Sequence, residues 1–232
     1  MTEMCTDKPE GPVLAPVFAV DRLRMGTDGP GVTTLVTFCG CPLKCRYCLN
    51  EQCHRHVPDI PGAGLCTPRG LLRWLRRDNI YFLMSGGGVC FGGGEPLLRH
   101  RFIRVFRRIC PQPWRISVET SLAVPRENLE ALLPVVDRWI VDIKDMNPLI
   151  YRRYTGADNG IVLENLRLLA TAANTKVTVR VPHIPDFNSP ADVQRSIDAV
   201  HVLGFDDIDE FTYLKPNIYH KHSTNEQRET KM

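Results

Sequence analysis

Residues 33–54 read TTLVTFCGCPLKCRYCLNEQCH, an apolar run followed at once by a cysteine-rich loop. The run 33–38 is rich in β-branched and aromatic residues, which favour strands. Further short apolar runs alternate along the chain with stretches of helical periodicity, a pattern typical of strand–helix units around a parallel sheet. The sequence therefore predicts an α/β fold in which the cysteine loop leaves the carboxyl end of the first predicted strand.

This pattern predicts six strands and three helices. The strands cover residues 33–38, 88–91, 115–119, 139–143, 176–181 and 207–214. The helices cover residues 102–109, 163–170 and 193–203, where apolar side chains repeat with helical spacing. In barrel-like α/β folds the carboxyl ends of the strands carry the chemistry. The cysteine loop therefore lies where a functional site is expected.

Length and composition limit the class of protein. The 232 residues suffice for one sizeable core and are too few for two ordinary domains, so we expect a single domain over residues 1–232. No apolar run approaches the roughly 20 residues that cross a bilayer, and the polar N-terminus lacks a secretory signal, so the expected location is the cytoplasm, away from any membrane. A net charge of +3 gives no argument for nucleic acid. We expect a monomer with fraying ends: an extension over residues 1–30 and a flexible tail over 217–232.

Nine cysteines in a chain of this size and composition favour metal binding over disulfides. Cys41, Cys45 and Cys48 follow one another at x3 and x2 spacing, so they can bind three irons of a 4Fe-4S cluster and leave the fourth iron open to a substrate. The same loop also suits structural zinc, with Cys53 or His54 as the fourth ligand. The spacing alone leaves both interpretations open.

The neighbouring residues distinguish between them. C-x3-C-x2-C with an aromatic residue, Tyr47, just before the last cysteine resembles the signature of the radical S-adenosylmethionine (SAM) superfamily. Gly93, Gly94 and Glu95, after the strand 88–91, resemble its Gly-Gly-Glu segment, which meets the amino group of SAM. Glycines allow backbone to approach a ligand closely, and a carboxylate is a partner for an ammonium. The resemblance implies that the three cysteines carry the catalytic cluster and that its open iron binds SAM.

A longer part of the chain, from about residue 26 to residue 188, resembles one branch of the superfamily. This branch is the activating enzymes of glycyl radical enzymes, typified by pyruvate formate-lyase activase. The matching segments are Asp28-Gly29-Pro30-Gly31, Gly40-Cys41-Pro42-Leu43, Glu95-Pro96-Leu97-Leu98, Thr155-Gly156 and Leu163-Glu164-Asn165-Leu166. The family fold is a partial TIM-like barrel of six βα units, in agreement with the six predicted strands.

The resemblance assigns further residues to the SAM site. Asp142 and Lys144 match the family's Asp-x-Lys near SAM, and Arg180 falls on the strand that borders the adenosine. Glu119 and Thr120 fall where the family has Asp-Thr, a pair associated with a monovalent cation beside SAM, so such a cation is a further expectation. Without the resemblance, Asp142 and Lys144 on one face of a strand are equally compatible with an exposed ion pair.

Some positions depart from the family pattern. Gly92 replaces the serine before Gly-Gly-Glu, and Glu119 is one methylene longer than the family's aspartate. The family's C-terminal Pro-aromatic-His has no clear counterpart, although His220 and His222 lie in the same region. Residues 51–70 supply only two cysteines, so a second cluster is not expected.

The resemblance implies an oxidoreductase. One electron from the cluster would cleave SAM to a 5'-deoxyadenosyl radical, which would take a hydrogen atom from a glycine of a partner glycyl radical enzyme. Arginines are frequent in residues 69–77 and 99–108. They form either a solvated surface or a docking site for an acidic flavodoxin- or ferredoxin-type reductant. Two alternatives remain: a radical SAM enzyme that acts on a peptide or a small molecule, and a zinc-stabilised binding module.

Overall fold

The computed structural model describes residues 12–172 and 176–213. Within these residues one sheet of eight strands has the order β3-β1-β2-β4-β5-β6-β7-β8. The strands are β1 (Ala15–Met25), β2 (Val32–Phe38), β3 (Gly64–Cys66), β4 (Gly88–Gly93), β5 (Arg115–Thr120), β6 (Arg138–Asp142), β7 (Lys176–His183) and β8 (Ile208–Thr212). From β2 to β8 the neighbouring strands are parallel, whereas β1 is antiparallel to β2 and to β3. All six predicted strands are confirmed, and the parallel part is the predicted partial barrel.

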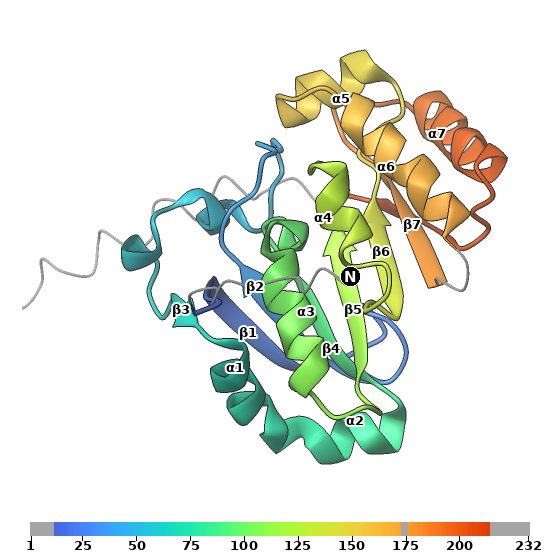
Figure 1. Cartoon of the computed structure of the whole chain (residues 1–232). Helices are drawn as coiled ribbons and strands as arrows, with labels where there is room; N and C mark the ends of the chain where they lie inside the picture. The colour runs from blue at the N-terminus through green and yellow to red at the C-terminus, as the bar shows by residue number, and fades with distance from the viewer. Residues whose placement is uncertain (1–11, 173–175, 214–232) are drawn as a thin grey trace, which may run out of the picture.

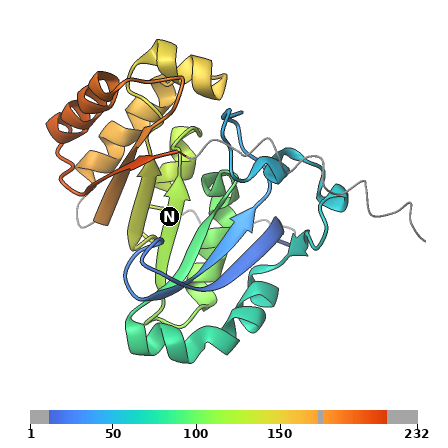
Figure 2. The same ribbon diagram turned by 180° about the vertical axis from the view of Figure 1, so that it is seen from behind.

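Helices connect the parallel strands. They are α1 (Pro68–Leu75), α2 (Asn79–Ser85), α3 (His100–Ile109), α4 (Arg126–Glu130), α5 (Pro148–Thr155), α6 (Gly160–Thr171) and α7 (Pro190–Val202), with short 3-10 turns η1 (Glu51–His54), η2 (Val57–Asp59), η3 (Arg76–Asp78) and η4 (Pro96–Arg99). Helices α3, α4 and α6 lie in front of the sheet in Figure 1 and behind it in the reverse view of Figure 2. Among the described residues, no helix combines the length and apolar character needed to span a membrane.

The core lies between the sheet and these helices. Phe102 and Phe106 of α3 are buried and point at the sheet, where their rings meet Phe38 and Phe91 edge to face at 5.5 Å. Burial of aromatic side chains is among the largest favourable terms in a core. This packing fixes the carboxyl ends of β2 and β4, at which the cysteine loop and the glycine segment begin.

The first strand corrects the expectation that residues 1–30 fray. Residues 15–25 form β1, which pairs with β2 along its length. Ala15 and Phe18 are buried, and the guanidinium of Arg22 donates to the fully buried carboxylate of Asp78 at 2.9 Å. These contacts join segments far apart in the sequence, so a polar composition did not reveal them. The expected tail 217–232, His220 and His222 lie outside the described residues.

Helix α5 has clear local signals at both ends. The Asn147 side chain accepts a hydrogen bond from the Leu149 amide at 2.9 Å, which caps the first turn. Gly156 ends the helix with φ of +78°, a conformation that glycine adopts without strain. The last carbonyls of α5 are thereby directed toward the cysteine loop.

Candidate active site

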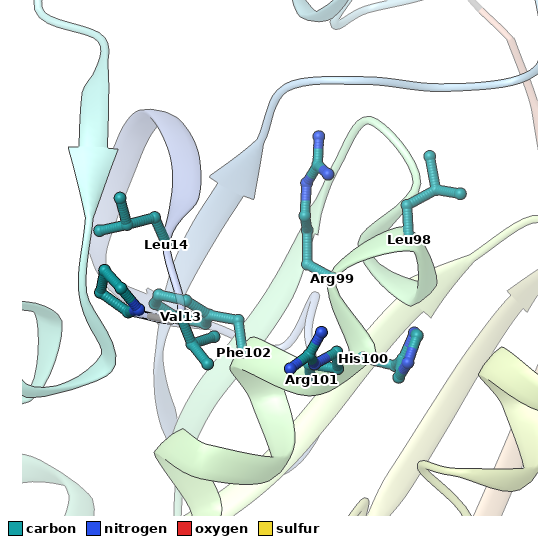
Figure 3. A pocket seen from close by; sticks show the side chains of 8 residues that line it. Val13, Leu14, Leu98, Arg99, His100, Arg101 and Phe102 are labelled. Carbon is teal, nitrogen blue, oxygen red and sulfur yellow. The ribbon is translucent and has the colours of Figure 1, made fainter. Parts of the chain in front are cut away.

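A cavity of about 220 Å3 lies at the carboxyl ends of the parallel strands. Every residue that the sequence assigned to the site lines this cavity: Cys41, Cys45, Tyr47, Cys48, Gly93, Gly94, Glu95, Glu119, Asp142, Lys144 and Arg180. Another hollow, of about 510 Å3 between residues 12–14 and 98–102, contains none of them (Figure 3). The structure thus gathers residues from five strand ends at one place.

Hydrogen bonds hold the cysteine loop on two sides. The backbone amides of Lys44 and Arg46, which flank Cys45, donate to the last carbonyls of α5 at 2.9 and 3.1 Å. On the other side, the amide of Glu95 donates to the carbonyl of Gly40 at 2.8 Å. The thiols are therefore positioned by backbone contacts that do not depend on a bound group.

The three thiols have different surroundings. Burial raises the pKa of Cys41 to about 12 and also raises the pKa of Cys45. The pKa of Cys48 is lowered, first of all by a hydrogen bond from the Cys53 thiol. Cys53 itself is only 2% exposed and packs with Phe18 outside the cavity. Cys53 is thus a neighbour of a cavity cysteine rather than part of the cavity wall.

The glycines at the end of β4 pack closely against other parts of the chain. A Cβ at Gly94 would lie 2.2 Å from the carbonyl oxygen of Gly40, and one at Gly93 would lie 2.6 Å from the Cβ of Thr37. Gly93 also has φ of +93°. The lack of side chains therefore lets the end of β4 pack against β2 and the start of the cysteine loop, a packing role in addition to the expected approach to a ligand.

Glu95 connects the ends of β4 and β5. Its buried carboxylate accepts hydrogen bonds from the hydroxyls of Thr120 and Ser121, both at 2.7 Å, and from the amides of Ser121 at 3.0 Å and Leu97 at 3.2 Å. Burial raises the pKa of Glu95 and these hydrogen bonds oppose the rise. Ser121, which the sequence analysis missed, follows β5 directly and lines the cavity.

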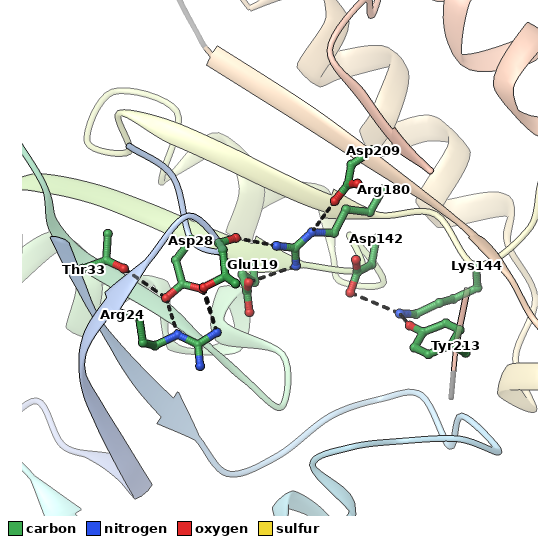
Figure 4. Close-up of polar contacts among 10 residues, drawn as sticks. Arg24, Asp28, Thr33, Glu119, Asp142, Lys144, Arg180, Asp209 and Tyr213 are labelled. Atoms are coloured by element: carbon green, nitrogen blue, oxygen red, sulfur yellow. Dashed lines mark hydrogen bonds and ion pairs between the residues drawn. The ribbon is translucent and has the colours of Figure 1, made fainter. Parts of the chain in front are cut away.

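Lys144 is buried, with its ammonium at the cavity wall. It lies 3.2 Å from a carboxylate oxygen of Asp142 and donates to the Tyr213 hydroxyl at 2.7 Å (Figure 4). Burial lowers the pKa of Lys144, but Asp142 and Tyr213 outweigh it and leave the pKa well above its ordinary value. The alternative of an exposed ion pair is wrong, because the Lys144 side chain is only 9% exposed. Tyr213, just after β8, was missed.

Arg180 and Glu119 form a second ion pair on the cavity wall. The guanidinium of Arg180 donates to Glu119 at 2.9 Å and to the carbonyl of Thr27 at 2.6 Å, and it lies 3.5 Å from Asp209. Burial raises the pKa of Glu119, while Arg180 lowers it. The Glu119 carboxylate is therefore already compensated by a fixed positive charge.

Aromatic residues line one side of the cavity. Tyr47 donates from its hydroxyl to a carboxylate oxygen of Asp186 at 2.9 Å, and its ring contacts the rings of Tyr154 and Phe187. Tyr154 is buried and lines the cavity. The aromatic rings of Tyr47, Tyr154 and Phe187 therefore form one packed cluster on this side of the cavity.

Among known protein families, a model of the Radical SAM superfamily matches residues 35–200, well over half of the chain. The pyruvate formate-lyase 1-activating enzyme of Escherichia coli is 32% identical over 194 residues, which cover 82% of this chain and 72% of that enzyme. The chain belongs to the activating enzymes of the radical SAM superfamily.

Two further similarities concern the family and the fold, respectively. The isethionate sulfite-lyase activating enzyme of Desulfovibrio desulfuricans is 29% identical in an alignment 245 positions long, gaps included, that covers 80% of this chain and 77% of that enzyme. The crystal structure of Streptococcus suis SuiB bound to S-adenosylmethionine superposes with a TM-score of 0.60 over 77% of this chain and 40% of that chain, at 15% identity. The latter similarity concerns the fold alone.

The cysteine loop fits the 4Fe-4S cluster of radical SAM proteins. In residues 12–172 and 176–213, no three Cys, His, Asp or Glu side chains converge as they do around a single metal ion. A cubane does not require convergence, because each thiolate binds a different iron. Because their pKa is raised, the thiols of Cys41 and Cys45 carry protons in the protein without iron. These protons would be released when iron binds the thiolates. The zinc alternative fits less well, because a single zinc ion needs ligands that converge on one point, and no three such side chains do so in the described residues.

The cavity also fits SAM in charge. SAM carries an ammonium, a carboxylate and a sulfonium, so its site needs groups of both signs. Asp142 and Glu119 supply carboxylates on the cavity wall, and Lys144 and Arg180 supply cations. Charge-assisted hydrogen bonds of this kind are stronger than neutral ones. The wall therefore offers groups of both signs to such a ligand.

The expected monovalent cation does not fit. Glu119 is paired with Arg180, and the Thr120 hydroxyl donates to Glu95 while it accepts from the amide of Leu122 at 2.9 Å. Both members of the pair that resembles the family's Asp-Thr are therefore engaged with other protein groups. These contacts argue against a cation at this position.

The contact between Gly94 and Gly40 leads to a first prediction. Gly94→Val is expected to lose iron and SAM binding together, since the new side chain displaces the cysteine loop that starts at Gly40. Iron content and calorimetric SAM titration after anaerobic reconstitution measure both. Gly64→Val is the matched control, because a Cβ there meets nothing within 4 Å. A variant that keeps its iron but no longer binds SAM would instead support the original ligand interpretation.

Proposed function

We propose that this protein activates a glycyl radical enzyme by removing a hydrogen atom from a glycine of that partner. The observation that carries the proposal is one cavity lined by three thiols, the glycine segment and charges of both signs. Named relatives that are activating enzymes support the choice of reaction. When bound, the cluster and SAM supply the one-electron chemistry that produces the radical which removes the hydrogen atom.

The chain's own residues bind and orient. The three thiols ligate the cluster, and the hydrogen bonds to α5 hold Cys45 in place. Lys144, with its raised pKa, stays protonated and offers a fixed positive charge to a carboxylate. Glu95 fixes the hydroxyl of Thr120 and the backbone amide of Ser121 on the cavity wall. Preorganised charges of this kind cost no rearrangement when the substrate arrives.

The aromatic side of the cavity is the proposed entrance for the glycine segment of the partner. Tyr47, Phe211 and Tyr213 line this part of the wall, and the exposed side chain of Leu49 lies on the adjoining loop. Apolar rings exclude water from a radical and accept a glycine, which has no side chain of its own. The eight cysteines of the described residues are free thiols, which agrees with our proposal of a cytoplasmic location.

The test is isotope transfer. Reconstituted protein is incubated anaerobically with SAM, dithionite and a peptide that carries the partner's radical-site glycine in dideuterated form. Deuterium is expected in 5'-deoxyadenosine by mass spectrometry, and the peptide with alanine at that position should transfer none. Hydrogen transfer from a metabolite or from another peptide residue, with none from glycine, would overturn the activase assignment in favour of another radical SAM reaction.

The electron must reach the cluster from outside the SAM cavity. A hollow of about 350 Å3 lies on the other side of the cysteine loop from the SAM cavity. Cys41 lines both the SAM cavity and this second hollow beside the loop. The second hollow is also lined by basic side chains: His54, Arg55, His56 and Arg99. We propose that an acidic flavodoxin- or ferredoxin-type donor docks here, because charge complementarity accelerates the encounter of such partners.

Charge reversal tests this docking surface. Arg55→Glu is expected to slow cluster reduction by a flavodoxin, with a smaller effect at high salt, and to leave reduction by dithionite unchanged. Anaerobic stopped-flow absorbance measures both rates. An equal rate with flavodoxin in wild type and variant would exclude this face as the docking site.

A further inference from the structure

The positions where this chain departs from its family pattern meet in space. Gly92 stands where the family has serine, and Glu119 stands where it has aspartate. A Cβ at Gly92 would lie 3.1 Å from a carboxylate oxygen of Glu119 and 3.4 Å from its Cβ. A serine at position 92 would therefore crowd the longer side chain at position 119. The missing side chain and the additional methylene compensate each other.

The space at Gly92 lets Glu119 reach across the sheet. Glu119 lies on β5 and Arg180 on β7, with β6 between them, and yet the two side chains are 2.9 Å apart (Figure 4). Both side chains are about four-fifths buried, with exposed fractions of 20% and 19%. Unlike Glu95, which is held by hydroxyls and amides, Glu119 has a cation partner, and Arg180 provides it from within the chain.

Other contacts fix the guanidinium where it is. Arg180 also donates to the carbonyl of Thr27 and faces Asp209, so carboxylates lie on two sides of it. Thr27 adjoins Asp28, which is fully buried and held by Arg24 at 2.6 Å. A guanidinium cannot lose its proton in a protein, and here it cannot diffuse away as a metal ion can.

We propose that the Arg180 guanidinium replaces the monovalent cation of the SAM site, so that SAM binding by this protein does not require such a cation. The positive charge beside Glu119 is built into β7, and a second cation at the same carboxylate would be repelled by it. The proposal rests on SAM binding in the cavity and not on which hydrogen atom is removed. Its failure is thus distinguishable from failure of the glycine assignment.

Salt replacement tests the proposal on the whole reconstituted chain. The dissociation constant of SAM is measured by calorimetry in KCl, NaCl and tetramethylammonium chloride at equal ionic strength. The three values for wild type are expected to agree within about twofold. Binding that is about tenfold or more tighter in K⁺ or Na⁺ than in tetramethylammonium would overturn the proposal.

Two variants supply the positive arm. Gly92→Ser with Glu119→Asp shortens the carboxylate and should make SAM binding about tenfold or more tighter in KCl than in tetramethylammonium chloride. Arg180→Gln removes the built-in cation and should bind SAM weakly in tetramethylammonium chloride, with partial recovery in KCl. If both variants fold and bind iron but their SAM affinity is the same in all three salts, the proposal is contradicted. If the double variant does not fold, the result for Arg180→Gln alone decides.

Thermal unfolding of the protein without SAM gives an independent readout. Gly92→Ser alone should lower the unfolding midpoint because of the 3.1 Å approach to Glu119, and adding Glu119→Asp should restore part of the loss. Additive effects of the two substitutions would mean that the positions are not coupled, and would remove the structural basis of the proposal.

Discussion

Cys45→Ala is expected to abolish the iron centre. The cluster has three protein thiolates for four irons, and the loss of one leaves two ligands. The amides that flank Cys45 are hydrogen-bonded to α5, and these bonds fix the position of its thiol. Another cysteine of the loop would have to move to replace Cys45 as a ligand. Iron per chain after anaerobic reconstitution should fall from near four to near zero, with loss of the brown absorption.

Cys53→Ala is the matched control for this experiment. Cys53 is buried outside the cavity and contacts the Cys48 sulfur only through its own thiol, so the iron content should remain that of wild type. A full complement of iron in Cys45→Ala would refute the cluster assignment. Iron loss in Cys53→Ala would reopen the interpretation in which this cysteine is a metal ligand.

Lys144→Met is expected to remove SAM binding and to lower the free energy of unfolding by about 3 kcal/mol. The substitution leaves the carboxylate of Asp142 and the hydroxyl of Tyr213 without their common partner. Removal of one member of a buried ion pair costs more than the pair contributes, because the other charge stays behind. Urea denaturation and calorimetric SAM titration measure the two effects.

The control here is Lys176→Met, the same change at an exposed lysine on the amino-terminal end of β7. That end of the sheet is remote from the cavity, so both the free energy of unfolding and the SAM affinity should stay within error of wild type. Equal behaviour of the two variants would show that the contacts of Lys144 contribute neither to stability nor to binding.

The sequence predicted the parallel strands and the cavity residues because both depend on local patterns. Short apolar runs bounded by turn residues identified β2 and β4 to β8, and each assigned residue lies in such a run or in the loop that follows it. A parallel sheet brings its carboxyl ends to one edge, so residues at these positions were bound to meet once the strands were correct. The residues of the site could therefore be predicted without knowledge of long-range contacts.

The errors concern contacts between distant segments. The burial of Lys144 depends on Tyr213, 69 residues further along the chain, and β1 depends on partners such as Asp78, 56 residues from Arg22. The pairing of Glu119 with Arg180 spans 61 residues. Periodicity reports on neighbours along one element and carries no signal for such pairs. The packing of Gly94 was not predicted for the same reason, since its neighbour is the carbonyl of Gly40.

Strand β1 has a consequence for any shortened version of this protein. If the chain were to begin at residue 30, on the view that the preceding segment is an appendage, β2 would become the border of the sheet. Its backbone groups, now paired with residues 17–25, would then face solvent beside largely buried side chains. Such an unprotected border is a template for strand addition between molecules. The shortened protein would thus be prone to self-association and fibril growth, although its cysteine loop and cavity residues are all retained.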